Sequence, residues 1–520
     1  MDGLAGICSK NYDENLVRKL FLATGSNQHR GKTCAGLAIG TKKGIYTHKK
    51  RGRIGDLRTD VMKTFQDMEP GVGIGNVGYT KNRIFENRNI EPIEILPKNN
   101  SKYQVFVTMD GHIVNANELK SELETDYTFE TNSETEIIGA LLHNFIKKEG
   151  VSFEAGEKLV DKLHGRATFS LTALVHDGKQ PYLIALNDDK AFEPFCYGTI
   201  DDAFLVSSES TAHRRLGGST ESQFKGAEMI ICSPGEDPKK QRLREEKMMP
   251  DVFQAVYFGN AASTFWGKQI FEIRRELGKE LIKEYGPTEG NIIIPNPESG
   301  WGVTIGLFEA SRDHYLKKAF DFSDRIPKIK DVAAFNRFLE YVTVYPALVK
   351  QAQAVRTFQE AKKAKRFTEV GLKFSAIDSL LNYIDVDEGD DSTVKGSVGE
   401  GGSNWAQKNA GIKKLVRWIS YGPMFFPSFK EWDRGEECLY ELAVQRAFKN
   451  DNPYNKSLEE INKAVAELTG VDEFRYNKKE LIEKVTGPGS FQALDASYPI
   501  SEEYLPDFIK REVEKFREYR

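Results

Sequence analysis

The sequence predicts two consecutive α/β domains. At 520 residues the chain is too long for one typical domain, so two are expected, each large enough to bury its own core. Residues 1–245 alternate short strand-like runs with a few helical stretches. From residue 246 to about residue 480, longer helical periods separate the strands, which is typical of a doubly wound α/β domain. Residues 481–520 are expected to form a C-terminal tail packed on the rest.

The composition is that of a soluble globular protein and argues against several kinds of partner. The 73 basic residues nearly balance the 77 acidic ones, which gives no electrostatic reason to expect nucleic acid or an anionic membrane. The five cysteines never show Cys-x-x-Cys spacing, so neither disulfides nor zinc is indicated, and a reducing cytoplasm is the expected location. No apolar run approaches the roughly 20 residues of a membrane span.

Three strands and one helix stand out in the first half. The strand-like runs are 104–107, 168–171 and 204–206. The segment Ser133–Phe145 is predicted to be helical because its apolar residues fall on one face, namely Ile137, Ile138, Leu141, Leu142 and Phe145.

The second half begins with a strand-like run at 256–258, followed by a helix whose apolar face carries Ile270, Ile273, Leu277 and Leu281. A buried-type strand at 291–294 then enters a tight loop that ends at Gly300, and a helix is expected at 303–310. A loop followed by a helix N-terminus presents backbone N–H groups to an anion. Taken alone, the same pattern also suits a plain strand-to-helix turn.

The acidic and small-residue stretch 388–397 is a second candidate phosphate site. Paired carboxylates at a strand end can hold ribose hydroxyls and a hydrated Mg²⁺, while N–H and hydroxyl groups of the following loop bind a 5′-phosphate. Alone, such a stretch is more often a solvated loop. The two stretches together resemble the diphosphate and sugar-phosphate loops of type I phosphoribosyltransferases.

The first half resembles the class II glutamine amidotransferase domain. The landmarks that occur in that family's order are Gly3–Ile7, Gln28–Gly31, Ala35-Gly36, Gly73–Tyr79, Asp110-Gly111 with Asn115, Asn132–Glu134 and Ser208–Ser210. The resemblance implies an N-terminal Ntn-hydrolase-like αββα sandwich.

Four positions depart from that family where its chemistry is done. Asp2 stands in place of the nucleophilic cysteine, and Gly78 in place of the arginine that clamps the glutamine carboxylate. Asp110 replaces the oxyanion-hole asparagine, and Asn132 the aspartate that holds the substrate amine. Loss of one oxyanion donor typically costs on the order of 10²–10³ in rate, and glycine offers no guanidinium to a carboxylate. We therefore expect glutamine to be neither held nor cleaved.

Two routes would restore a nucleophile to this half. Processing after Ile7 would expose Cys8, but the glycine-rich strand that should follow a nucleophile precedes Cys8 instead. If Asp2 were an artefact of the sequence, a cysteine could stand in its place, but Gly78, Asp110 and Asn132 would still depart from the family. The segment Gln28–Gly31 is therefore best interpreted as a structural turn with a hydrogen-bonded histidine.

The whole chain resembles the glutamine phosphoribosylpyrophosphate amidotransferase family. The further segments in family order are 297–299, 355–358, 371–374, 419–423 and 456–461. This implies a type I phosphoribosyltransferase domain after the sandwich. By the same resemblance, the residues that bind phosphoribosyl pyrophosphate are Glu298, Ser299, Gly300, Asp390, Asp391, Ser392, Thr393, Val394, Lys395, Gly396 and Ser397. Arg356 falls on the family's mobile loop, and Ser299, Asp390 and Asp391 would contact Mg²⁺.

The identity of the acidic pair stays open at this point. The family has an apolar strand directly before its pair, and the run 380–386 would deliver Asp387 and Glu388 to the strand end. Asp390 and Asp391 are favoured because the loop 392–397 then fits without a gap.

Three functions follow from the resemblance. The leading one is phosphoribosyl transfer to ammonia or another amine, with Mg²⁺, in a homo-oligomer whose glutaminase domain serves as scaffold. The second is a non-catalytic protein that binds sugar phosphate or nucleotide and regulates a partner. The third is the ordinary glutamine-dependent enzyme of purine synthesis. No iron–sulfur cluster is expected, because the cysteines that ligate one in some members are absent.

Overall fold

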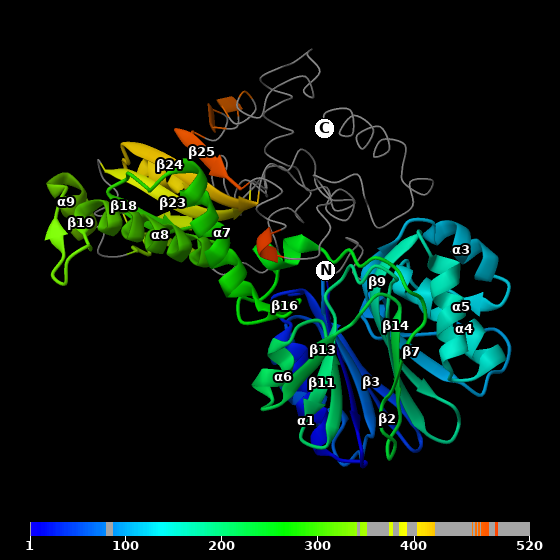
Figure 1. Cartoon of the computed structure of the whole chain (residues 1–520). Helices are drawn as coiled ribbons and strands as arrows, with labels where there is room; N and C mark the ends of the chain where they lie inside the picture. The colour runs from blue at the N-terminus through cyan, green and yellow to red at the C-terminus, as the bar shows by residue number, and fades with distance from the viewer. Residues whose placement is uncertain are drawn as a thin grey trace. The chain divides into compact units, whose positions relative to one another are not determined.

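The computed structural model describes residues 2–79, 87–340, 344–350, 374–377, 384–392 and 403–421. It also describes residues 460, 463–464, 466–467, 470–477 and 484–486. The chain forms two compact units, one through Asp251 and one from Val252 onward (Figure 1). Among the helices in those ranges, none combines the length and apolar character that crossing a bilayer requires.

The first unit contains two antiparallel sheets. The strands of the seven-stranded sheet are, in spatial order, β13 (Ser219–Gln223), β11 (Cys196–Ile200), β12 (Ala203–Ser207), β1 (Gly3–Ser9), β4 (Val72–Gly78), β2 (Cys34–Thr41) and β3 (Gly44–Arg51). Those of the six-stranded sheet are β15 (Lys239–Arg242), β14 (Glu228–Cys232), β10 (Pro181–Asn187), β9 (Ala167–His176), β7 (Gln104–Ile113) and β5 (Ile93–Glu94). A small separate ladder joins β6 (Leu96–Pro97) to β8 (Tyr127–Thr128).

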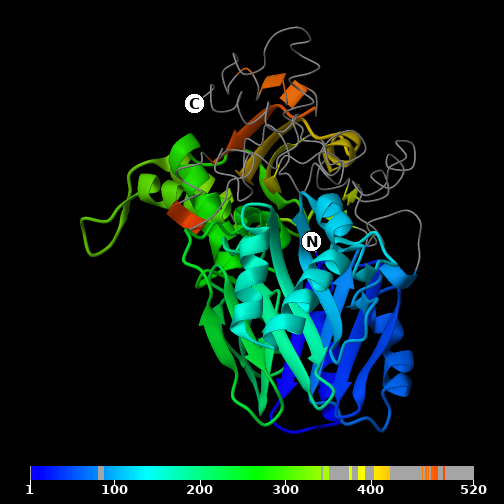
Figure 2. The same cartoon turned by 90° about the vertical axis from the view of Figure 1, so that its right-hand side faces the viewer.

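Helices cover the outer face of each sheet. The seven-stranded sheet packs against α1 (Asn15–Ser26), η1 (Ile54–Leu57), α2 (Arg58–Thr64) and α6 (Thr211–Arg215). The six-stranded sheet packs against α3 (Ala116–Leu123), α4 (Glu134–Glu149) and α5 (Phe153–Leu163). Figure 2 shows helices of this second group, in cyan, lying across the face of their sheet. Helix, sheet, sheet and helix follow one another, so the predicted αββα sandwich is confirmed.

Side-chain alternation along β1 builds this layering. Leu4 and Cys8 point into the core between the sheets, whereas Ala5 and Ile7 point into the core beneath the helices. Gly6 also faces the other sheet, and a methyl group there would lie 2.8 Å from Leu183 Cδ1. Glycine at this position therefore lets the two sheets approach closely.

The elements predicted for the first half are confirmed. The runs 104–107, 168–171 and 204–206 lie in β7, β9 and β12. Helix α4 begins after Ser133, whose hydroxyl accepts a hydrogen bond from the Thr135 N–H and so caps the helix.

The second unit is built on a four-stranded parallel sheet. Its strands are β18 (Ile292–Pro295), β23 (Asp385–Ser392), β24 (Lys414–Tyr421) and β25 (Glu473–Tyr476). Helices α7 (Ile270–Tyr285) and α8 (Trp301–Ala319) pack on it through a core that includes Leu281, Val303, Leu307 and Trp418. The remaining described elements are β16 (Thr264–Phe265), β17 (Lys268–Gln269), β19 (Phe320–Asp321), β20 (Lys328–Ile329), α9 (Val332–Glu340), β21 (Leu348–Lys350), β22 (Phe374–Ala376) and α12 (Ser403–Asn409).

The strand predicted at 256–258 is wrong. Residues Gln254–Phe258 form a π-helical segment, η3, before the helix that was correctly expected at 270–281. The buried Arg274 donates hydrogen bonds to the carbonyls of Ala255, Tyr257 and Gly259 at 2.8–3.0 Å. These carbonyls are bound by a side chain rather than by a neighbouring strand. The helix expected at 303–310 is also longer, because α8 runs to Ala319.

We predict that His143 makes the first unit sensitive to acid. The ring lies in the core, where Tyr127 and Ser101 contact its two nitrogens, and burial lowers its pKa from 6.5 to about 4. The unfolded chain binds this proton more tightly, so the stability is present above pH 6.5 and is lost as the pH falls toward 4, by on the order of 2–3 kcal/mol. In urea unfolding, the free energy of unfolding should therefore fall less steeply between pH 6.5 and pH 4 for His143→Gln than for the wild type. The partly exposed His48→Gln serves as the control, and an unchanged slope in His143→Gln would contradict the assignment.

Candidate functional site

The four positions at which the first unit departs from the amidotransferase motifs lie close together. Asp2 directly precedes β1, and its backbone N–H donates to Asp110 Oδ1 on β7 of the other sheet at 2.8 Å. Gly78 ends β4, which pairs with β1, and Asn132 lies just before the cap of α4. Asp2, Gly78 and Asn132 all line one cavity of about 40 Å³. Residues that are far apart in the sequence thus meet, as the motif order implied.

A buried arginine fixes this end of the first unit. Arg30 has no exposed surface, and its Nε donates to the Asp2 carbonyl at 3.0 Å. Its two terminal nitrogens contact Asp110 Oδ2 and Glu209 Oε1, each at 3.0 Å. Burial acts against the charged form, but these two carboxylates outweigh it and raise the pKa of Arg30. The guanidinium therefore stays charged and paired.

This network determines which hydrogen-bonding groups Asp110 can offer to a ligand. Both oxygens of its carboxylate accept hydrogen bonds, one from the Asp2 N–H and one from Arg30. A carboxylate has no N–H to donate to a developing oxyanion, unlike the amide of an asparagine. His29 contacts Glu209 Oε1 at 2.6 Å, which agrees with the structural turn expected for this segment.

Sequence reasoning missed two residues of the cavity, Glu91 and Cys34. The Glu91 carboxylate accepts hydrogen bonds from Asn76 Nδ2, the Met109 N–H and the Thr135 hydroxyl at 2.5–3.1 Å. Burial, and then the charges of Asp2 and Glu91, raise the pKa of Cys34 to about 12. The Cys34 thiol therefore stays protonated near neutral pH and is no substitute nucleophile. No motif or spacing in the sequence marked either residue.

The second candidate site lies where β18 and β23 end side by side. After β18, the chain turns tightly, with the Gly300 N–H donating to the Asn296 carbonyl at 2.9 Å, and α8 then begins. A methyl group on Gly300 would lie 2.3 Å from the Gly389 carbonyl oxygen, and one on Gly389 would lie 2.2 Å from Thr304 Oγ1. These two glycines are required for the turn to lie against β23. Within the turn Glu298 is exposed and Ser299 partly buried.

The acidic residues within and at the end of β23 have different surroundings. Asp387 is bonded to Trp418 Nε1 and the Gly290 N–H, both at 2.6 Å, and burial raises the pKa of its carboxyl. Glu388 is bonded to Gln407 and Arg417 at 2.6–3.2 Å and has no exposed surface. Both lie within the strand, which continues to Ser392 because β24 pairs with it as far as Tyr421. Their contacts are structural.

Asp390 and Asp391 lie at the carboxyl end of β23. Asp390 accepts from Asn296 Nδ2 at 3.0 Å and faces Arg417 at 3.4 Å. The Ser299 hydroxyl donates to Asp391 Oδ1 at 2.5 Å. The turn after β18 and the end of β23 are thereby joined. Of the other predicted residues, Ser392 is the last of the strand, while Arg356, Thr393, Val394, Lys395, Gly396 and Ser397 lie outside the described residues.

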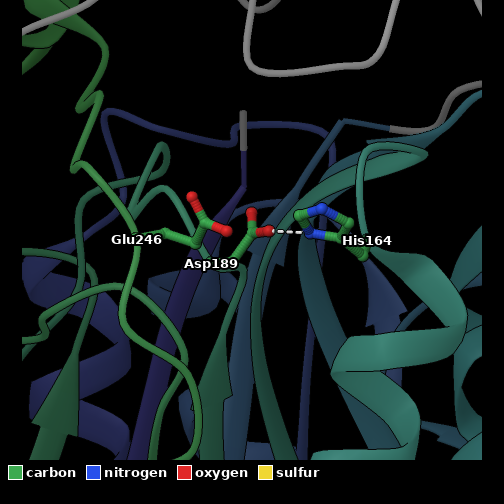
Figure 3. Close-up of side chains that lie close together, drawn as sticks. All are labelled: His164, Asp189 and Glu246. Carbon is green, nitrogen blue, oxygen red and sulfur yellow. Dashed lines mark hydrogen bonds and ion pairs between the residues drawn. The ribbon is translucent and has the colours of Figure 1, made fainter.

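A third cluster of polar side chains lies elsewhere in the first unit. His164, Asp189 and Glu246 converge, and the His164 ring is hydrogen-bonded to Asp189 (Figure 3). Two cations also contact the group, because Lys190 lies 3.0 Å from Glu246 and Arg244 lies 3.3 Å from Glu246 and 3.4 Å from His164. The arrangement is an ion-pair network that ties the segment around residue 246 to the sandwich.

We predict that Arg30→Met destabilises the first unit by about 3–5 kcal/mol, because it leaves the buried carboxylates of Asp110 and Glu209 without their cation. The free energy of unfolding in urea measures this. The double variant Arg30→Met, Asp110→Asn should recover part of the loss, since one of the two charges is gone. A double variant as unstable as the single one would show that Asp110 does not carry the effect.

Comparison with known proteins gives matches over both units. A family described as a glutamine amidotransferase domain matches residues 93–214. The amidophosphoribosyltransferase of Methanocaldococcus jannaschii is 28% identical over 507 residues, covering 94% of each chain. That of Archaeoglobus fulgidus is 28% identical over 480 residues, covering 90% of this chain and 95% of the relative.

Solved structures share the two-domain fold. Glutamine phosphoribosylpyrophosphate amidotransferase from B. subtilis, in complex with ADP and GMP, superposes with a TM-score of 0.74 at 22% identity. The match covers 97% of this chain and 98% of that one. The domain match and the relatives show that the chain is a divergent homologue of amidophosphoribosyltransferases over nearly its whole length. The solved structure shows that the fold is shared.

Proposed function

We propose that this protein transfers the phosphoribosyl group of phosphoribosyl pyrophosphate to ammonia or another small amine, with Mg²⁺, and does not hydrolyse glutamine. The name of its relatives, amidophosphoribosyltransferase, supports the first part. The surroundings of Asp2, Gly78, Asp110 and Asn132 support the second.

The observation that carries the proposal is the contact between Ser299 and Asp391. It joins the turn after β18 to the end of β23, across 92 residues of sequence. Ligands of open parallel α/β sheets bind at the carboxyl ends of the strands. A hydroxyl, the amides of a tight turn and a carboxylate are suited to a diphosphate and the hydroxyls of a ribose.

The oxygen donors at this edge suit Mg²⁺. Ser299, Asp390 and Asp391 offer one hydroxyl and two carboxylates, and a hard cation prefers oxygen ligands. When bound, Mg²⁺ would offset negative charge on the diphosphate. Asn296 and Arg417 contact Asp390, so its carboxylate is held in one orientation before any ligand arrives.

The transfer step itself is assisted by protein side chains. The bond from the anomeric carbon to the diphosphate oxygen breaks as the bond from that carbon to the incoming nitrogen forms, and the nitrogen then loses a proton. Positive charge builds at the anomeric carbon, where the carboxylates of Asp390 and Asp391 can stabilise it. Glu298 and Gly300 of the turn, the residues from Ser392 to Ser397, and Arg356 complete the proposed site. A homo-oligomer is the assembly we propose.

We expect Asp391→Asn to lower kcat/KM for phosphoribosyl pyrophosphate on the order of 10²-fold, because the carboxylate that faces the ribose loses its charge. Diphosphate release with ammonium as the nitrogen donor measures this. The matched control is Asp313→Asn, an exposed residue of α8, which should behave as the wild type. Equal rates for both variants would rule out this role for Asp391. Tight binding by a wild type that releases no diphosphate would instead indicate a non-catalytic regulator.

Glutamine should not replace ammonium as the nitrogen donor. We expect no glutamate release from glutamine by the wild type, and none by Asp2→Cys, because Gly78 and Asp110 still leave the glutamine carboxylate and the oxyanion without donors. An enzyme-coupled glutamate assay decides this. Glutamate release by the wild type would show an ordinary glutamine-dependent enzyme and overturn this half of the proposal.

A further inference from the structure

We propose that the cavity beside Asp2 binds an ammonium ion in place of glutamine. The inference rests on the proposed function, because it names the nitrogen compound that this enzyme would hold. Three features of the cavity support it: hydrogen-bond acceptors without donors, negative charge and small size.

The first feature is a pair of oxygen acceptors that face one small space. The Asp2 side chain is only 6% exposed, and the hydrogen bonds described for Asp2 use its backbone N–H and carbonyl rather than its carboxylate. Asn76 is 1% exposed and donates its Nδ2 to Glu91, so its Oδ1 is left as an acceptor. A methyl group on Gly78 would lie 3.0 Å from Asn76 Oδ1 and 3.4 Å from Asp2 Oδ1. A ligand between them must donate hydrogen bonds.

The second feature is the charge of the lining. Asp2 and Glu91 are acidic and almost fully buried, and no cationic side chain lines the cavity among the described residues. The raised pKa of Cys34, caused first by burial and then by these two carboxylates, reflects the same negative surroundings. Arg30 lies nearby but is committed to Asp110 and Glu209. A cation in the cavity would offset this charge.

The third feature is size. A cavity of about 40 Å³ has room for a few water-sized particles, since one water needs roughly 10–15 Å³ by the same measure. A whole glutamine molecule is larger than a few water-sized particles. The Glu91 carboxylate already accepts from Asn76 Nδ2, the Met109 N–H and the Thr135 hydroxyl, so the Asp2 carboxylate and Asn76 Oδ1 are what the cavity offers to a cation. Ammonium carries one positive charge and four N–H donors, and therefore matches both the charge and the acceptors.

Thermal unfolding of the full chain tests the proposal without relying on turnover. Ammonium chloride is titrated at constant ionic strength, with tetramethylammonium chloride as the balancing salt. A ligand that binds only the folded state raises Tm, and above its Kd the rise follows the logarithm of the ligand concentration. We expect this rise for the wild type and its loss in Asp2→Asn, which removes the charge, and in Gly78→Ala, which fills the space. Glu69→Gln, an exposed acid of the same unit, should keep the rise.

Each outcome of this experiment either supports or overturns a stated claim. Equal Tm in the two salts for the wild type, or a rise with ammonium that persists in both cavity variants, overturns the proposal. An equal effect of potassium chloride overturns the assignment to ammonium and leaves a general site for monovalent cations. If phosphoribosyl transfer fails but ammonium still raises Tm, the proposed function falls while this binding site stands.

Discussion

The buried guanidinium of Arg30 is the interaction on which one end of the first unit depends. It joins the start of β1, through the Asp2 carbonyl, to Asp110 on the opposite sheet and to Glu209 beyond β12. Transfer of an arginine out of water is costly, and two carboxylates with good geometry offset that cost. The same network occupies both carboxylate oxygens of Asp110 and holds the backbone of Asp2, so it both stabilises the sandwich and positions a residue of the cavity.

The second unit also contains a buried arginine that is paired with carboxylates. Arg417 has no exposed surface and is held by Glu388, while its other terminal nitrogen faces Asp390. Glu388 and Arg417 belong to the neighbouring parallel strands β23 and β24, where their Cα atoms are paired in register. A buried ion pair inside the sheet thus positions the Asp390 carboxylate near the carboxyl end of the strand. Along β23, the acids with structural contacts, Asp387 and Glu388, come before Asp390 and Asp391 at its end.

The proposed loss of glutamine chemistry and the proposed gain of a cation site have one physical origin. Asp2 stands where the amidotransferase motif has cysteine, so a nucleophile is absent and a negative charge is present. Gly78 stands where the motif has arginine, so a positive charge is absent. The acceptors that remain, Asp2 and Asn76, then face each other across a space that only a small donor can fill. The residue types alone show how each difference alters charge and hydrogen bonding. That these differences meet in one cavity is seen only in the structure.

Sequence patterns alone were enough to predict the two α/β units, several of the strands and helices, and the departures from the amidotransferase motifs. These features are local, because they follow from the period of apolar residues, the turn chemistry and the order of short motifs. The strand prediction at 256–258 failed because a distant side chain, Arg274, binds the carbonyls of this segment. Which acidic residues of β23 reach the strand end depends on pairing with β24, a contact between distant segments that the sequence does not display. Only the tertiary structure also brought Glu91 and Cys34 to Asp2, because burial and charge at one point in space are summed over segments that no sequence pattern links.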